Sequence, residues 1–428
     1  MRRTVMLILA AIVAAPALGQ SPAPQPAIRD PDLAERAYIA ASAYHAVKRY
    51  FAHAEGLPAD YDFEARYRAY LAEALAAPDR AAFTRASMRF FASLRNGHSS
   101  FTDRQLGERA GPAPFSVRRV DGRWTITESR LADLAPGDVI VTIDGQSPDA
   151  WLAPRRELVA ASNEAAADRA QWFFPLMPQR FTIGTAGGRA VVVDLNTVPD
   201  VPPRGRRRPE KVETIRRPDG VLVIRIPSFD DRAFESAAID AVKQAGAARA
   251  ILFDVRGNGG GATPSRLLAA IMNRPYRGTL YVTPQTIAEV DAQQVFGDGV
   301  PALPKMMLRL GPDVTQPAPG AWAGKMAVLA DGGCGSACED FVLRFRDGKR
   351  GLVLGEATAG TTGQPYFVRF PEFGMSFRVS TKREYFPDGA PFEGVGVRPD
   401  RAIPLTLAEL RDGGDVQLEQ AVKALLAS

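Results

Sequence analysis

The spacing of apolar residues differs among three stretches of the chain. Between residues 31 and 95, apolar side chains recur at every third or fourth position, a period that predicts amphipathic helices. The expected helices cover 32–47, 63–76 and 80–94. The last helix stops at Asn96-Gly97, a pair typical of a helix C-terminus. We therefore expect an N-terminal helical domain at residues 31–105.

Between residues 113 and 197 the apolar period shortens to two, which predicts half-buried strands. Two alternating runs flank Asp121-Gly122, a dipeptide typical of a two-residue hairpin. Residues 137–145, Gly-Asp-Val-Ile-Val-Thr-Ile-Asp-Gly, resemble the central segment of PDZ domains. The glycine-rich carboxylate-binding loop of such domains has no convincing counterpart here. We expect an inserted PDZ-like β module at 113–197 and leave open whether it binds peptide C-termini.

From residue 219 to the C-terminus, short apolar runs alternate with helical periods. This alternation predicts an α/β core at 219–428 with a largely parallel sheet. The expected strands are 221–226, 250–255, 325–330 and 351–354, and the expected helices are 232–245, 264–272 and 339–346. We interpret the Pro/Arg-rich stretch 198–218 as a linker, and the Pro- and Gly-rich stretch 274–322 as an excursion from the core.

The first 19 residues have the pattern of a secretory signal peptide. Two arginines precede an apolar run at 5–15, which is too short to span a bilayer, and small residues precede Gln20. We expect cleavage, a periplasmic or secreted chain without a membrane span, and a linker at 20–30. The formal charge of +5 falls to +3 once Arg2 and Arg3 are removed, which is too small to indicate nucleic-acid binding.

The chain has two cysteines, Cys334 and Cys338, and they bracket Ser336. A Cys-x-x-x-Cys pair without further Cys or His residues nearby is poor evidence for zinc, so we expect no metal and no cofactor. Two interpretations of the pair are open. An oxidising compartment permits a disulfide, and a tight turn can also bury two free thiols.

Two glycine-rich stretches hold the candidate chemistry. Ser336 lies between the expected strand 325–330 and the following helix, where a nucleophile is exposed and helix amides face it. Ser336-x-x-Glu339 is also a capping box, in which the serine merely caps the helix. Residues 254–261, Asp-Val-Arg-Gly-Asn-Gly-Gly-Gly, either present backbone amides to an oxyanion or form a tight connection.

Taken together, residues 254–261 and Gly-Ser-Ala-x-Glu-x-Phe at 335–341 resemble the S41 peptidases. This family includes the C-terminal processing proteases and the tricorn core proteases. Further matching segments follow in the family's order at 224–229, 355–364 and 393–400, so the resemblance covers about 221–405. It implies a ClpP/crotonase-like core and a serine-type endopeptidase that cleaves peptides or unfolded proteins through an acyl-enzyme. The oligomeric state is left open.

The family contains two catalytic arrangements. The processing proteases use a lysine in a Gly-Lys-Gly segment, and here Gly360-Thr361-Thr362 lacks it. The tricorn-like branch uses a histidine in a segment resembling Asp-Gly-His-Ser, which residues 96–99, Asn-Gly-His-Ser, match with Asn for Asp. The resemblance therefore implies Ser336 as nucleophile and His98 as general base. An imidazole with a pKa of about 6.5 suits that task at neutral pH.

The same branch implies further site residues. Glu393 matches the motif of the glutamate that completes the site, and Ser99 is the candidate for an auxiliary serine whose usual place is Gly97 here. The oxyanion hole is expected from the N–H of Ala337 together with that of Gly259 or Gly260.

Other interpretations remain to be weighed. We interpret the remaining histidines, His45 and His53, as surface or packing residues. One alternative function is a non-catalytic ligand-binding module, as in the retinoid-binding proteins related to this family, and a complete set of site residues argues against it. Another is an acyl-CoA enzyme of the crotonase type, which an exported chain disfavours.

Overall fold

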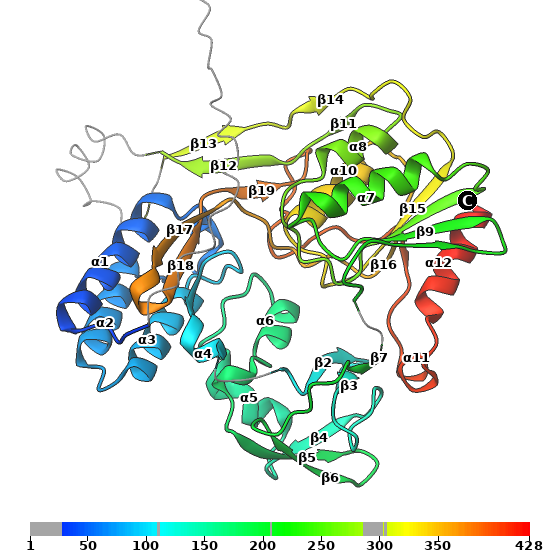
Figure 1. Cartoon of the computed structure of the whole chain (residues 1–428). Coiled ribbons are helices and arrows are strands. Elements are labelled where there is room, and N and C mark those ends of the chain that lie inside the picture. Colours follow the sequence, from blue (N-terminus) through cyan, green and yellow to red (C-terminus); the bar gives the residue numbers. More distant parts are fainter. Residues whose placement is uncertain (1–27, 109–111, 206–207, 286–302, 304–305) are drawn as a thin grey trace, which may run out of the picture.

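The computed structural model describes residues 28–108, 112–205, 208–285, 303 and 306–428. The expected signal peptide at 1–19 lies outside the described residues, as does most of the linker that follows it. Within the described ranges, no helix combines the length and apolar character that a membrane crossing requires. The fold is mixed α/β (Figure 1).

A six-stranded sheet forms the centre of the C-terminal half. Its strands, in spatial order, are β20 (Arg401–Ala402), β16 (Leu352–Gly355), β15 (Lys325–Ala330), β10 (Ala250–Asp254), β9 (Val221–Arg225) and β8 (Glu213–Arg216). All neighbours are parallel except β8, which runs antiparallel to β9. The expected largely parallel sheet is confirmed. The linker prediction for 198–218 is wrong at β8, which belongs to this sheet.

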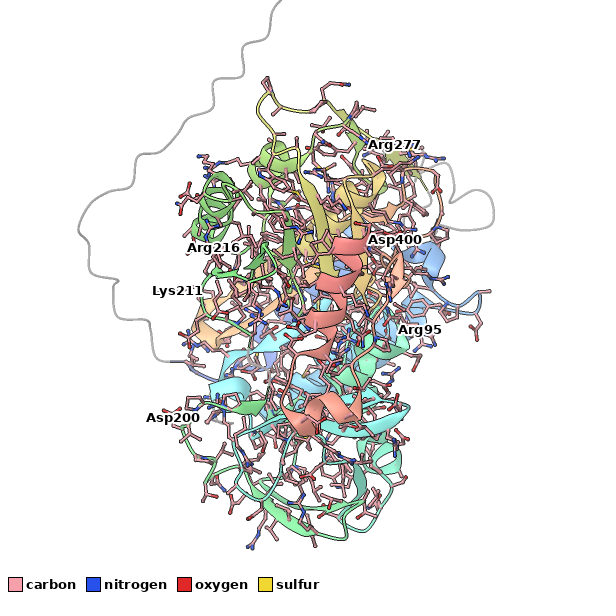
Figure 2. All side chains as sticks on the ribbon, turned by 90° about the vertical axis from the view of Figure 1, so that its right-hand side faces the viewer. Arg95, Asp200, Lys211, Arg216, Arg277 and Asp400 are labelled. Carbon is pink, nitrogen blue, oxygen red and sulfur yellow. A yellow bond between two sulfur atoms is a disulfide. The ribbon has the colours of Figure 1, made fainter. Side chains whose placement is uncertain are left out.

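Helices cover both faces of this sheet. One face carries α7 (Arg232–Lys243), α8 (Ser265–Ile271) and α10 (Ala337–Asp347), and the other carries α12 (Val416–Ala427) (Figure 1). In Figure 2, α12 lies between Arg216, on the β8 edge, and Asp400, beside the β20 edge. Side chains of β15 alternate accordingly, because Met326 and Val328 face the first layer while Ala327 and Leu329 face α12.

Three helices form the N-terminal part: α1 (Leu33–Tyr50), α2 (Phe63–Ala76) and α3 (Arg80–Ala92). Each begins after an aspartate whose carboxylate accepts a hydrogen bond from a first-turn amide, which fixes where the helix starts. Their apolar core includes three strands: β1 (Ser100–Asp103), β17 (Pro365–Phe370) and β18 (Met375–Ser380). Since β1 pairs with β18, the segment after α3 is held beside the hairpin of residues 365–380.

Two small sheets surround one apolar cluster of the segment 113–197, and one of them takes its third strand from the expected linker 198–218. Their strands are β2 (Phe115–Val120), β3 (Arg123–Ser129) and β7 (Arg204–Gly205) in one, and β4 (Ile140–Ile143), β5 (Arg180–Thr185) and β6 (Ala190–Asp194) in the other. Two helices accompany them, α5 (Pro148–Arg156) and α6 (Glu164–Ala170). The expected hairpin is confirmed, since Asp121 and Gly122 join β2 to β3 with positive φ. The PDZ-like character of this segment stays a prediction.

The remaining elements are short. The expected excursion holds β11 (Tyr276–Arg277), β12 (Leu280–Pro284), β13 (Met307–Leu310) and β14 (Val314–Thr315), and β12 also pairs with β19 (Arg383–Tyr385). Residues 286–302 and 304–305 of this stretch lie outside the described residues. The other helices of the described ranges are α4 (Arg104–Glu108), α11 (Leu407–Asp412) and the 3-10 turns η1 (Ala54–Gly56), η2 (Phe174–Leu176) and η3 (Pro371–Phe373).

Candidate active site

Ser336 occupies the turn between β15 and α10. Its backbone has φ 54° and ψ −125°, a conformation that residues with a side chain rarely adopt and that costs on the order of 1–3 kcal/mol. The Ser336 side chain makes no capping hydrogen bond, although the residue precedes the first helical position. The capping-box interpretation is therefore wrong. The positive φ carries the serine away from the geometry in which its hydroxyl reaches the amides of the first turn.

Glu339, the other half of the expected capping box, serves a neighbouring loop instead. Its buried carboxylate accepts hydrogen bonds from the Thr358 hydroxyl (2.5 Å), the Gly360 N–H (2.7 Å) and the Thr361 N–H (2.9 Å). Burial raises the pKa of Glu339 to about 8, and these three hydrogen bonds oppose that shift. The Ser336 N–H in turn donates to the Thr361 carbonyl (2.9 Å). Glu339 thus holds the loop 358–361 against the start of α10.

The glycine-rich loop 254–261 packs directly against the Ser336 turn. Gly335 N–H donates to the Asn258 carbonyl (3.1 Å), and Gly260 has φ 98°. A Cβ atom added to Gly260 would lie 2.6 Å from the Gly335 carbonyl oxygen and 2.8 Å from the Ala337 nitrogen. Only glycine allows this approach. The Asp331 carboxylate joins the two loops from behind, because it accepts from backbone amides of both.

The two glycines predicted for the oxyanion hole differ in whether their N–H group is already hydrogen-bonded. The Gly260 N–H donates to the side-chain oxygen of Asn258 (2.9 Å) and is already used. Among the described residues, no hydrogen bond has the N–H of Gly259 or Ala337 as its donor. Of the predicted donors, Ala337 and Gly259 are therefore the two whose N–H groups stay unengaged in the described structure.

His98 lies at the end of the segment that follows α3, and its side chain is buried. The His98 N–H donates to the Asn96 side-chain oxygen (3.0 Å), and Nδ1 lies 3.1 Å from the Thr361 hydroxyl oxygen. Burial lowers the pKa of His98 to about 3, with a smaller contribution from the positive charges of Arg378 and Lys382. The imidazole is therefore neutral at neutral pH, as a general base must be.

The other two histidines agree with their interpretation as packing and surface residues. His53 is buried, with Nε2 2.9 Å from the Ser380 hydroxyl, and His45 is exposed on α1.

Glu393 bonds to Asn96 of the histidine segment, and among the described residues no hydrogen bond joins its carboxylate to the His98 ring. One carboxylate oxygen accepts from the Asn96 amide (2.8 Å) and from the Ser162 hydroxyl (2.5 Å), and the other accepts from the Thr362 N–H (3.2 Å). Burial raises the pKa of Glu393 to about 7, and the Ser162 hydrogen bond partly offsets the shift.

The structure gives Ser99 different neighbours from those of an auxiliary serine. Its hydroxyl donates to the Asn96 side chain (2.9 Å) and accepts from the Ser380 N–H (3.1 Å). In the described part of the chain, Ser99 contacts neither the His98 ring nor Glu393 by hydrogen bonds.

Thr361 is the residue that joins the predicted site residues. Its hydroxyl lies beside His98, and its carbonyl accepts from the Ser336 N–H. No hydrogen bond links the His98 ring to the Ser336 hydroxyl among the described residues. Sequence reasoning used Thr361 only as the place of an absent lysine and missed Ser162 altogether. The only local signal near Ser162 is Asn163, which caps α6.

The cysteine pair is a disulfide. Cys334 and Cys338 are bonded and buried on either side of Ser336, which settles the alternative that the sequence left open. No group of three or more His, Cys, Asp or Glu side chains suited to a metal ion occurs in the described ranges.

A cavity of about 980 Å³ opens between the segment 113–197 and the sheet core. Arg118, Arg169 and Asp331 line it, together with Gly257 and Gly333 from the backs of the two glycine-rich loops. Neither Ser336 nor His98 lines this cavity, so it lies behind the candidate site.

Comparison with known proteins agrees with this architecture. Residues 220–403 match the model of peptidase family S41. A carboxy-terminal-processing protease of Bartonella bacilliformis is 30% identical over 94 residues, which make up 22% of this chain and 21% of that protein. The match thus spans about a fifth of the curated relative.

Solved structures share the fold at low sequence identity. Mature CPAF complexed with lactacystin gives a TM-score of 0.70 at 16% identity and covers 92% of this chain and 98% of its own. A candidate peptidase from Parabacteroides merdae gives a TM-score of 0.53 at 16% identity, with 91% and 96% covered. These likenesses concern the fold. The family match is a separate finding: the sheet core at residues 220–403 resembles peptidase family S41.

Proposed function

We propose that this chain is an exported serine endopeptidase that cleaves peptides or unfolded proteins through an acyl-enzyme on Ser336. The observation that carries the proposal is the strained backbone of Ser336. The Ser336 hydroxyl does not cap α10, and the turn that holds it packs against the glycine-rich loop 254–261. Residues in rare backbone conformations concentrate at active sites because the surrounding structure must hold them there. The proposed site is therefore built around this turn.

His98 acts as the general base. As the Ser336 hydroxyl oxygen attacks the peptide carbonyl carbon, His98 Nε2 takes the hydroxyl proton and becomes an imidazolium. The tetrahedral intermediate expels the amine of the substrate, which receives that proton. A water molecule then attacks the acyl-enzyme, again with His98 as base, and frees Ser336.

The oxyanion of both intermediates accepts hydrogen bonds from the N–H groups of Ala337 and Gly259. Ala337 is the first residue of α10, so the partial positive charge of the helix N-terminus adds to the stabilisation. The loss of one such donor typically costs roughly 10²–10³ in rate. Glu393 holds the histidine segment through Asn96.

Two features support export. The N-terminal sequence has the pattern of a signal peptide, and the disulfide beside Ser336 suits an oxidising compartment. The curated relative is itself described as a carboxy-terminal-processing protease, which is consistent with a peptide or protein substrate.

Cleavage of denatured casein tests the proposal. We expect Ser336→Ala and His98→Ala to abolish cleavage, while His45→Ala, a change of an exposed histidine on α1, leaves it intact. If Ser336→Ala cleaved casein as fast as the parent protein, the assignment would be wrong. A parent protein that bound peptides without cleaving them would favour the non-catalytic ligand-binding alternative.

A further inference from the structure

We propose that Glu393 orients the His98 ring through the hydroxyl groups of Thr361 and Ser162, so that the inserted segment 113–197 supplies a positioning residue to the active site. This relay rests on the proposed role of His98 as general base. It replaces the single auxiliary serine that the sequence suggested.

Three short distances define the relay. His98 Nδ1 lies 3.1 Å from Thr361 Oγ1, and Thr361 Oγ1 lies 3.1 Å from Ser162 Oγ. Ser162 Oγ lies 2.5 Å from Glu393 Oε1. All three separations fall within hydrogen-bonding range. In the described structure, this is the hydrogen-bonded path from the imidazole ring to the Glu393 carboxylate.

The number of available protons sets the direction of the relay. An ionised carboxylate can only accept, so Ser162 donates to Glu393 Oε1, and its hydroxyl is also the donor in the longer contact with Thr361 Oγ1 (3.1 Å). Thr361 Oγ1 is therefore an acceptor in the relay, and it has a second lone pair for a proton on His98 Nδ1.

The consequence is a fixed tautomer of His98. Because Thr361 accepts, the His98 proton sits on Nδ1, and Nε2 keeps the lone pair that a general base needs. Asn96 complements the relay. The Asn96 side chain donates to Glu393 and accepts from the His98 N–H. Asn96 therefore positions the backbone of His98, while the relay positions its imidazole ring.

Ser162 is placed by the connection between α5 and α6. The adjacent Asn163 caps α6 through its side-chain oxygen, and its amide donates to the carbonyls of Ala359 (2.8 Å) and Gly394 (3.1 Å). These carbonyls belong to the two loops that carry Thr361 and Glu393. Docking of the inserted segment therefore fixes all members of the relay at once.

The test compares Thr361→Val, which keeps the shape and removes the hydroxyl, with Thr361→Ser, which keeps the hydroxyl. We expect Thr361→Val and Ser162→Ala to lower kcat by roughly 10–10²-fold, less than the roughly 10²–10⁴ that a general base contributes, with KM little changed. Thr361→Ser restores most of the rate. Ser116→Ala, at an exposed serine of the same segment, is the matched control.

A second readout does not depend on catalysis. Imidazole ¹⁵N chemical shifts, assigned with His98→Ala, are expected to show the Nδ1–H tautomer of His98 in the parent protein and loss of that preference in Thr361→Val. An unchanged kcat together with an unchanged tautomer in Thr361→Val would overturn the relay. If the parent protein shows the expected tautomer but cleaves nothing, the relay stands and the peptidase proposal fails.

Discussion

The close contact between Gly260 and the nucleophile turn makes Gly260→Ala the sharpest single perturbation. The new Cβ would lie 2.6 Å from the Gly335 carbonyl oxygen, 2.7 Å from Ser336 Cβ and 2.8 Å from the Ala337 nitrogen. Two of these three atoms are backbone atoms, so they cannot rotate away. The loop or the turn must move by several tenths of an ångström, and the movement displaces the proposed nucleophile Ser336 and the proposed oxyanion donor Ala337.

Two costs add in this variant. The positive φ of Gly260 costs an alanine on the order of 1–3 kcal/mol in unfolding free energy. Displacement of reacting groups by about 1 Å typically costs about 10²-fold in rate. We therefore expect Gly260→Ala to lower the rate at which a fluorophosphonate labels Ser336 by roughly 10–10²-fold, beyond any loss of stability.

Gly122→Ala is the matched control. Gly122 also has positive φ (74°), but a Cβ atom there would meet nothing within 4 Å. Gly122→Ala has the conformational cost of a positive φ but no close contact of the new Cβ atom. It should therefore have a lower unfolding free energy in urea, while the fluorophosphonate should label its Ser336 at the rate of the parent protein. If folded Gly260→Ala labelled as fast as Gly122→Ala, the contact would not position the nucleophile.

Three further predictions concern the buried acids and the disulfide. The pKa of Glu393 in the folded protein is about 7 and the relay needs the ionised carboxylate, so kcat/KM should rise as the pH increases through about 7. His98, with a pKa of about 3, stays neutral in that range. A kcat/KM profile that rises near pH 3 to 4 instead would contradict the role of Glu393. Glu339→Gln should lower the unfolding free energy measured in urea by about 1–3 kcal/mol, because an amide nitrogen then faces buried donors; an unchanged value would refute that reasoning. Replacing Cys334 and Cys338 by serine removes a short covalent loop and should lower the unfolding free energy by about 2 kcal/mol, and equal stability would contradict this.

Local sequence patterns were sufficient for the elements of the core. The expected strand 325–330 coincides with β15 because a run of small apolar residues buried on both faces has few alternatives. The expected starts of α2 and α3 agree because Asp62 and Asp79 cap them. Ser336 was identifiable as a candidate because the glycines around it mark a tight turn.

The features of the site that could not be predicted from the sequence depend on packing between distant segments. The capping box failed because the loop 254–261 holds Ser336 at positive φ and Glu339 finds three donors in the loop 358–361. Which glycine amide stays unengaged depends on the Asn258 side chain. Ser162 and Thr361 are 199 positions apart, and no periodic pattern relates residues at such a distance.

The most direct test of the central claim is to map the residue that a fluorophosphonate probe modifies in the mature chain. Digestion and mass spectrometry should place the label on Ser336 alone, and labelling should be at least about 10²-fold slower in His98→Ala. A label on another serine, or labelling of Ser336→Ala at the parent rate, would contradict the account.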